Sequence, residues 1–256
     1  MSRIKELFDK KHNRILNVYF TAGYPSINSA LEIMETLQSG GVDLIELGMP
    51  YSDPLADGPV IQQSSAVALN NGMTIATLFE QLSNFRERIQ VPVVLMGYMN
   101  PVLQYGFEKF CADASAAGID GLILPDLPPY EFESIYQDVL RRYGLDFIFL
   151  VTPETSDERV KKLDELSSGF LYAVSSSSTT GTDQSRKDVA DYLKKLKSMN
   201  LKNPILVGFG IKDKESFDAV CNYANGGIIG TAFIKAIGEP GTLKENITGF
   251  LEKILS

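Results

Sequence analysis

The chain has 256 residues, of which 44% are hydrophobic and 22% are charged, a composition typical of a globular protein with a sizeable core. Its net charge of -8 argues against nucleic acid and anionic membrane surfaces as partners. No apolar run approaches the length of a membrane span, and no signal-peptide-like segment follows the charged N-terminus. We therefore expect a cytoplasmic protein with one domain, residues 1–256.

Short apolar runs alternate with helical periodicity along the whole chain. The runs are Ile15–Thr21, Val42–Gly48, Val91–Met96, Gly121–Leu124, Phe147–Val151, Phe170–Val174, Ile205–Gly208 and Gly227–Gly230. Between them, apolar residues recur at helical spacing, as in Ile75–Ile89 and Phe132–Tyr143. This alternation predicts an α/β fold, a parallel sheet closed into a (β/α)8 TIM barrel with an extra N-terminal helix. A doubly wound open sheet is the alternative, because spacing alone does not show closure.

Two connections stand out by their length or composition. The first follows the second predicted strand and runs from Met49 to about Gly72, which is long for a strand-to-helix loop. The second, Ser175–Thr182, follows the sixth strand and contains only serine, threonine and one glycine. Both follow the C-terminal ends of strands, where barrels of this kind keep their active sites.

The second strand carries a carboxylate where a buried strand should be apolar, because Glu46 lies between Ile45 and Leu47. An unpaired buried carboxylate costs several kcal/mol. Glu46 is therefore either paired with a Lys or Arg of a neighbouring element or functional. Asp57 lies in the loop that follows the same strand. Two carboxylates at the mouth of one strand indicate an acid/base pair.

Metal chemistry is not expected. His12 is the only histidine, and the two cysteines, Cys111 and Cys221, lie far apart at apolar helical spacing. These residues do not supply a zinc site, so proton transfer falls to carboxylates, tyrosines or lysines.

Glycines mark the ends of the last two predicted strands. Gly208 and Gly210 follow the seventh strand, and Gly230 precedes Thr231 at the end of the eighth. Glycine lets backbone N–H groups approach phosphate oxygens, and barrels of this kind often bind phosphate at this place. The alternative is that these glycines only permit tight turns.

The stretch Leu44–Pro59, LIELGMPYSDPLADGP, resembles the signature of the tryptophan synthase alpha subunit family. In that family a strand ending in Glu-Leu-Gly precedes a Pro-aromatic-Ser-Asp-Pro-x-Ala-Asp-Gly-Pro loop. The resemblance implies a lyase that splits indole-3-glycerol phosphate into indole and glyceraldehyde 3-phosphate by retro-aldol chemistry. It implies no cofactor in this chain, and an alpha2beta2 complex with a beta subunit that holds pyridoxal phosphate.

The same resemblance implies roles for individual residues. Glu46 matches the family's acid/base residue, and Asp57 matches the residue that faces the indole N–H. The implied substrate contacts are Tyr98, Tyr172, Thr180, Gly181, Phe209, Gly210, Gly230 and Thr231. Asp53 and Asn100 match residues that face the beta subunit, and Asp126 matches a position at the end of strand four.

One segment departs from the family pattern. After the sixth strand the family commonly reads Ser-Arg-x-Gly-Val-Thr-Gly, whereas this chain has Ser175–Thr180 before Gly181. The Thr-Gly end is kept, so phosphate binding is still expected, but the arginine and the first glycine are missing.

Two other functions remain as alternatives. A free-standing indole-releasing lyase would use the same carboxylates without a partner, and a silent phosphate-binding activator would use neither. Intact Glu46 and Asp57 argue against the activator. Indole-glycerol-phosphate synthase is also a phosphate-binding barrel, but it lacks the loop found after the second strand.

Overall fold

One parallel sheet forms the centre of the molecule. The computed structural model describes residues 2–174, 183–208 and 210–256. Within them the strands are β1 (Ile15–Thr21), β2 (Leu44–Gly48), β3 (Val93–Met96), β4 (Gly121–Ile123), β5 (Asp146–Phe147), β6 (Leu150–Val151), β7 (Leu171–Val174), β8 (Ile205–Gly208) and β9 (Gly226–Ile229). Their order in the sheet is β5-β4-β3-β2-β1-β9-β8-β7-β6, and every pairing in it is parallel.

The sheet closes on itself because its two end pieces, β5 and β6, are halves of one strand. Only Ile148 and Phe149 separate them in the chain. The Ile148 N–H donates to the Leu122 carbonyl of β4, and the Tyr172 N–H of β7 donates to the Phe149 carbonyl, both at 3.0 Å. The fifth predicted strand therefore joins both ends of the sheet. The predicted barrel is confirmed, and the open sheet is excluded.

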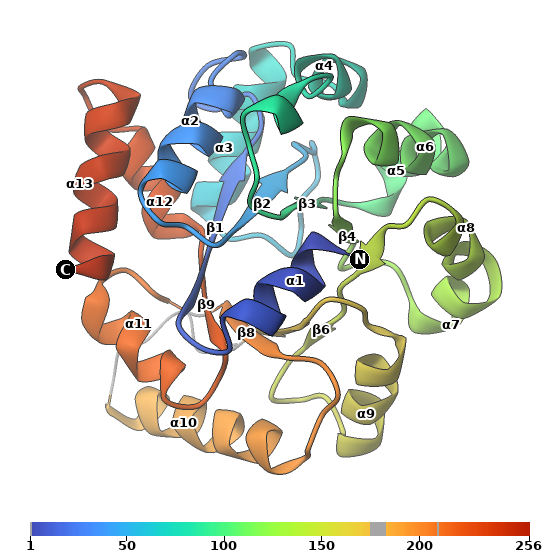
Figure 1. The fold of residues 1–256 in the computed structure, drawn as a ribbon, viewed down its shortest axis with the longest axis vertical. Coiled ribbons are helices and arrows are strands. Elements are labelled where there is room, and N and C mark those ends of the chain that lie inside the picture. The colour runs from blue at the N-terminus through green and yellow to red at the C-terminus, as the bar shows by residue number, and fades with distance from the viewer. Residues whose placement is uncertain (1, 175–182, 209) are drawn as a thin grey trace.

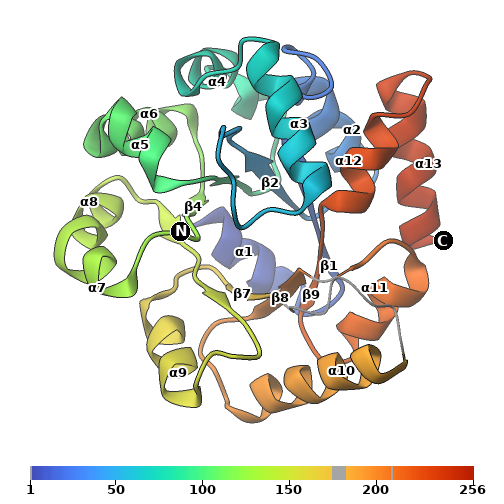
Figure 2. The same ribbon diagram turned by 180° about the vertical axis from the view of Figure 1, so that it is seen from behind.

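Helices surround this ring, as Figures 1 and 2 show from its two ends. Those described are α1 (Arg3–Lys10), α2 (Ala30–Ser39), α3 (Pro59–Asn70), α4 (Ile75–Gln81), η1 (Phe85–Glu87), α5 (Met99–Tyr105), α6 (Phe107–Ala117), α7 (Pro129–Glu131), η2 (Phe132–Tyr136), α8 (Gln137–Arg142), α9 (Asp157–Leu166), α10 (Asp183–Ser198), α11 (Lys214–Cys221), α12 (Thr231–Ile237) and α13 (Leu243–Leu255). Among these helices none has both the length and the apolar character needed to cross a lipid bilayer.

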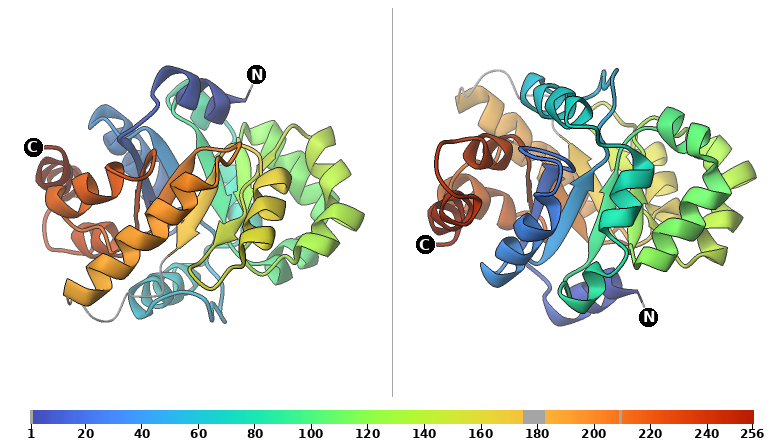
Figure 3. Two further views of the ribbon diagram at one scale, coloured as in Figure 1. Left: turned by 90° about the horizontal axis from the view of Figure 1, so that it is seen from below. Right: turned by 90° about the horizontal axis from the view of Figure 1, so that it is seen from above.

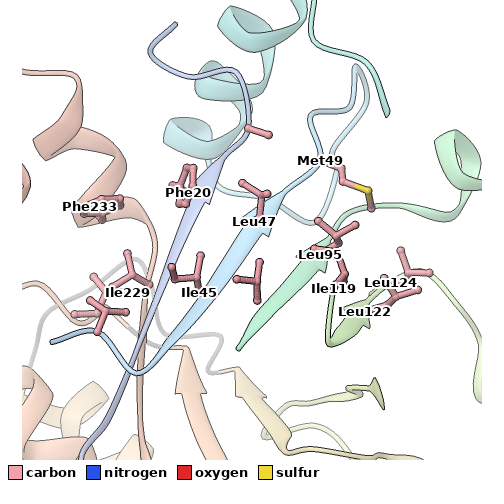
Figure 4. Packing of buried hydrophobic residues seen from close by; sticks show 14 of the residues in the cluster. Phe20, Ile45, Leu47, Met49, Leu95, Ile119, Leu122, Leu124, Ile229 and Phe233 are labelled. Atoms are coloured by element: carbon pink, nitrogen blue, oxygen red, sulfur yellow. The ribbon is translucent and has the colours of Figure 1, made fainter. Parts of the chain in front are cut away.

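The strands bury apolar side chains on both faces, since successive residues point to opposite sides of a sheet. On β1, Leu16, Val18 and Phe20 belong to the outer core between the sheet and the helices, whereas Ile15 belongs to a separate inner cluster. Figure 4 shows the outer core, with Phe20 facing Phe233 of α12. Burial on both faces explains why the strands read as continuous apolar runs.

Helix α1 closes the N-terminal end of the barrel. Its Ile4 and Phe8 join the inner cluster, and the Phe8 ring lies 6.3 Å from the Phe170 ring at the start of β7. In both views of Figure 3, α1 and the start of α3 lie at opposite ends of the barrel. The predicted N-terminal helix is confirmed, and it leaves the C-terminal end of the strands as the open end.

The loop after β2 is shorter than predicted. It ends at Gly58, because the residues from Pro59 to Asn70 form α3. Proline is favoured in the first turn of a helix, where its missing N–H has no intrahelical role. The second predicted loop, Ser175–Thr182, lies outside the described residues.

A π turn changes the predicted helix over 132–143. Phe132 and Leu140 are buried as the apolar spacing predicted, but Ile135 is 57% exposed. Residues Phe132–Tyr136 form a π-helical turn between α7 and α8. A π turn winds more residues per turn than an α-helix, so Ile135 faces away from the core.

An ion-pair network holds the N-terminal end of the barrel together. Asp120, which precedes β4 and is buried, accepts hydrogen bonds from Arg86, from Arg3 at 3.0 Å and from the Val93 N–H of β3 at 2.8 Å. Arg86 also donates to the Gly118 and Val91 carbonyls at 2.9 and 2.7 Å. Burial lowers the pKa of Arg86 to about 10 even though the Asp120 carboxylate opposes this shift.

We expect Arg86→Met to lower the free energy of unfolding by about 3 kcal/mol, because it leaves the Asp120 carboxylate buried with fewer partners. Arg88→Met is the matched control, since Arg88 is more exposed and pairs with Glu35. A surface pair of that kind contributes about 1 kcal/mol or less. Urea unfolding of both variants measures the difference, and equal losses would contradict the assignment.

Candidate active site

The carboxylate of Glu46 is buried inside the barrel. Glu46 is the central residue of β2, and its side chain is 0% exposed. The Asn17 side-chain amide on the adjacent strand β1 donates to its Oε1 at 2.5 Å, whereas Oε2 has no hydrogen-bond partner among the described residues. No Lys or Arg of the described chain pairs with it, so the structural alternative of a paired strand glutamate is excluded.

Burial changes the protonation of Glu46. It raises the pKa from 4.5 to about 8, although the hydrogen bond from Asn17 acts in the opposite direction. A group with this pKa is present in both its acid and its base form near neutral pH, which suits an acid/base catalyst.

Asp57 lies at the mouth of the same strand in a less buried place. The Tyr98 hydroxyl donates to Asp57 Oδ2 at 3.1 Å and accepts from the Ala56 N–H at 3.2 Å. Burial raises the pKa of Asp57, and the hydrogen bond from Tyr98 opposes this shift. The loop after β2 is thus held against the end of β3, where Tyr98 precedes α5.

Both carboxylates affect the pKa values of two phenols, that of buried Tyr19 and that of half-buried Tyr172. The pKa of Tyr172 on β7 is raised well above 10 by burial and then by the charges of Glu46, Tyr19 and Asp57. The pKa of Tyr19 on β1 is raised by burial and then by the charge of Asp57, with a smaller contribution from Glu46. Both phenols are therefore within electrostatic reach of Glu46 and of Asp57.

Glycines at two strand ends make room for these phenols. A Cβ at Gly48 would lie 2.3 Å from the Tyr19 hydroxyl, and a Cβ at Gly208 would lie 2.4 Å from the Tyr172 hydroxyl. Such distances are far inside van der Waals contact. Any larger residue would therefore move the rings that border the carboxylates.

The predicted phosphate residues lie at two neighbouring strand ends. Gly210 is exposed and follows β8, while Gly230 and the exposed Thr231 begin α12 directly after β9. Strands β8 and β9 are paired, so the structure brings these three residues to the same side of the barrel. The first N–H groups of α12 have no acceptors within the helix. Thr180, Gly181 and Phe209 lie outside the described residues.

The predicted partner residues are exposed. Asp53 lies in the loop after β2 and accepts a hydrogen bond from Ser52 at 2.5 Å. Asn100, in α5, donates to the Tyr51 hydroxyl at 3.1 Å, and the Tyr51 ring lies 5.3 Å from the Tyr98 ring. The loops after β2 and β3 are therefore joined at the surface. Asp126 has a different local role, because both its oxygens accept from the Met99 N–H at 3.0 Å and so cap α5.

Sequence reasoning missed Asn17 and Tyr19, which border the two carboxylates. A signal was present, since Asn17, Tyr19 and Thr21 alternate with Val18 and Phe20. This alternation places polar residues on one face of a strand whose other face is apolar. Among the described residues no group of three or more His, Cys, Asp or Glu side chains is placed to hold a metal ion.

Comparisons with known proteins agree with this geometry. The family model described as "Tryptophan synthase alpha chain" matches residues 5–254. The tryptophan synthase alpha chain of Christiangramia forsetii is 50% identical over 99% of this chain and 98% of the relative. That of Flavobacterium johnsoniae is also 50% identical, over 95% of this chain and 96% of the relative.

Solved structures give the same result. The alpha subunit of tryptophan synthase from Legionella pneumophila has a TM-score of 0.91 and 34% identity, covering 99% of this chain and 97% of that chain. A chain of tryptophan synthase from M. tuberculosis, in its aminoacrylate-bound form, has a TM-score of 0.87 and 31% identity, covering 99% and 98%. The fold, the buried glutamate and these matches together place the chain in the tryptophan synthase alpha chain family.

Proposed function

We propose that Glu46 and Asp57 are the acid/base pair with which this chain carries out the alpha reaction of tryptophan synthase. That reaction cleaves indole-3-glycerol phosphate to indole and D-glyceraldehyde 3-phosphate. One observation carries the assignment: a fully buried carboxylate, one of whose oxygens has no hydrogen-bond partner among the described residues, acts on the same two phenols as a second, less buried carboxylate.

The reaction needs proton transfer at two atoms. The indole carbon that bears the side chain gains a proton, and the hydroxyl on the adjacent side-chain carbon loses one. The carbon–carbon bond then breaks, its electrons return to the indole ring, and the hydroxyl-bearing carbon becomes the aldehyde. Glu46 suits these transfers, because a pKa of about 8 supplies acid and base forms at neutral pH.

Asp57 suits a different role. Positive charge develops at the indole nitrogen when the ring carbon is protonated, and a carboxylate facing that N–H stabilises it. The hydrogen bond from Tyr98 favours the charged form of Asp57. Two carboxylates in unlike surroundings thereby take unlike roles.

The remaining predicted residues complete a substrate site. Tyr98 and Tyr172 would line the indole pocket together with Phe209. Gly210, Gly230 and Thr231 would hold the phosphate with backbone N–H groups, together with Thr180 and Gly181 of the adjoining loop. The paired ends of β8 and β9 and the free N–H groups at the start of α12 support this part of the proposal.

We also propose that the partner is a tryptophan synthase beta subunit in an alpha2beta2 complex. Large apolar side chains are exposed on three successive connections: Leu55 is 92% exposed, Leu103 48% and Tyr130 79%. These connections follow β2, β3 and β4, which are neighbours in the sheet, and exposed Ile135 lies close behind in the chain. Exposed large apolar side chains on neighbouring connections support a protein interface on this side of the barrel. They lie on the same connections as Asp53 and Asn100.

The assignment of the cofactor follows from the reactions proposed for the two subunits. The alpha reaction as proposed needs only proton transfer and charge stabilisation, so no cofactor is assigned to this chain. Pyridoxal phosphate is assigned to the beta subunit alone. A free-standing lyase would use the same carboxylates but would leave the exposed apolar side chains without a partner, and a silent activator would not need Glu46. The cytoplasmic location stays a prediction.

We expect Glu46→Gln to lower kcat by about 10²-fold or more, because the amide keeps the shape of the side chain but does not transfer protons. Binding of glycerol 3-phosphate, which tests the phosphate site, should change little. Steady-state indole release and calorimetric titration measure the two effects. Retention of more than half of the wild-type rate would contradict the assignment.

The same variant tests the raised pKa without any assay of activity. The pKa of Glu46 is near 4.5 in the unfolded chain and about 8 in the folded chain. Between these two pH values the carboxyl group is protonated in the folded chain only, so the stability that Glu46 contributes falls as the pH rises through this window. Glu46→Gln lacks this loss. Relative to the wild type, the free energy of unfolding of the variant should therefore be higher at about pH 9 than at about pH 5, as measured by urea unfolding.

Tyr98→Phe should move the acidic limb of the rate profile to higher pH. The Tyr98 hydroxyl favours the charged form of Asp57, so its removal raises the pKa of Asp57, and activity that needs the carboxylate is then lost at a higher pH. Asp57→Asn should lower kcat strongly at every pH. Tyr51→Phe is the control, because Tyr51 packs on Tyr98 without contacting Asp57. An unshifted limb in Tyr98→Phe would contradict this role.

Asp53→Ala should reduce activation by the beta subunit and leave the rate of the isolated chain within about twofold, because an exposed side chain remote from the reacting atoms acts only through docking. Indole release is measured with and without the cognate beta subunit. Glu252→Ala, an exposed position on α13, is the control. Equal rates of the wild type with and without the partner would favour the free-standing lyase.

A further inference from the structure

An amide side chain lies where the barrel interior is otherwise apolar. Asn17 is 0% exposed, and its register neighbours are Leu44 on β2 and Ile228 on β9. Ile15, two residues earlier on the same face of β1, belongs to the inner apolar cluster. A buried amide in such a place is unfavourable unless its hydrogen bonds are made. The contact it makes is with the carboxylate assigned to proton transfer.

The contact between the two side chains is one-sided. Asn17 Nδ2 donates to Glu46 Oε1 at 2.5 Å. Asn17 Oδ1 and Glu46 Oε2 are both buried without a hydrogen-bond partner in the described part of the chain. The amide therefore holds one carboxylate oxygen and leaves the other without a hydrogen bond in the described part of the chain.

We infer that Asn17 is a positioning residue for Glu46: it holds Oε1, directs proton exchange to Oε2, and remains a hydrogen-bond partner in both protonation states of the carboxyl group. This inference rests on the proposed role of Glu46. It assigns a part in the reaction to β1. The family signature, Leu44–Pro59, lies after β1 in the chain and does not include Asn17.

An amide is suited to this task by its chemistry. Its planar group carries N–H donors, so Asn17 donates to Oε1 when Glu46 is charged and also when Oε2 carries the proton, because Oε1 remains an acceptor in both forms. A Lys or Arg in the same place would keep Glu46 charged. A hydrocarbon would serve neither form and would raise the pKa of Glu46 above that of the wild type, because the donation from Asn17 lowers it.

In the described part of the chain no Lys or Arg pairs with Glu46. Asn17 of β1 contacts it, and Tyr19 of β1 and Tyr172 of β7 lie within its electrostatic reach. Asp57, in the loop after β2, acts on the same two phenols. The two phenols have raised pKa values and stay neutral. In the described part of the chain, Asn17 is therefore the side chain that favours the charged form of Glu46.

The test uses Asn17→Leu, which keeps a similar volume without donor or acceptor, and Asn17→Ser, which keeps a shorter group with both. For Asn17→Leu we expect kcat to fall by about tenfold to a hundredfold with KM within about twofold, since the acid/base group is no longer held. The limb of the pH profile assigned to Glu46 should rise by about one pH unit. Asn17→Ser should lie between the leucine variant and the wild type.

Two further measurements separate positioning from a structural role. In a Glu46→Gln background, Asn17→Leu should change the residual rate by less than about twofold, because the two residues act as one unit. Carbon-13 NMR titration of the Glu46 carboxyl, identified by its loss in Glu46→Gln, should show a higher pKa in Asn17→Leu than in the wild type. Urea unfolding shows whether each variant is folded, and Asn17→Ser carries the test if the leucine variant is not.

An unchanged pKa of Glu46 in a folded Asn17 variant would overturn the inference, and so would an equal loss of rate in the wild-type and Glu46→Gln backgrounds. These outcomes differ from failure of the proposed function. If Glu46→Gln retained the wild-type rate, the assignment of Glu46 would fail, while the NMR titration would still report whether Asn17 controls its protonation.

Discussion

A closed barrel has a single interior, and every inward-pointing side chain must share it. Here α1 seals the N-terminal end, and an apolar layer that includes Ile15 and Leu44 of the strands lies above it. The carboxylate of Glu46, on β2 just beyond this layer, is buried without a cation among the described residues. The raised pKa of Glu46 follows from that position, and so does its capacity to give and take a proton near neutral pH.

The same architecture explains why the two carboxylates differ. Glu46 belongs to the strand, whose backbone is paired on both sides, and its side chain is fully buried. Asp57 belongs to the loop that follows and accepts its hydrogen bond from Tyr98, between β3 and α5. Parallel strands bring all their C-terminal ends to one side of the barrel. The two carboxylates lie at different depths on that side, and their different burial supports the different roles proposed for them.

This arrangement also links catalysis to the surface. Tyr98 contacts Asp57 and packs against Tyr51, and Tyr51 in turn accepts from Asn100 on α5. Asn100, which is assigned to the partner interface, is thus three contacts away from a carboxylate assigned to the reaction. A partner that orders the loops after β2 and β3 would act on Asp57 through this chain of contacts, without reaching Glu46 inside the barrel.

Local patterns in the sequence were sufficient for the strands, the N-terminal helix and the anomalous Glu46, because apolar runs and a misplaced charge are visible within a few residues. Closure of the sheet into a barrel was decided by the tertiary structure, in which β5 and β6 join its two ends. Only the tertiary structure placed Asn17 against Glu46, 29 positions away in the chain, and gathered Tyr19 and Tyr172 around them. The register and tilt of neighbouring strands decide which inward side chains meet, and no spacing along one strand encodes them. The π turn at Ile135 could not be predicted from the sequence for a related reason. Apolar spacing predicts a regular α-helix over the whole segment, whereas packing decides where the helix departs from regular geometry.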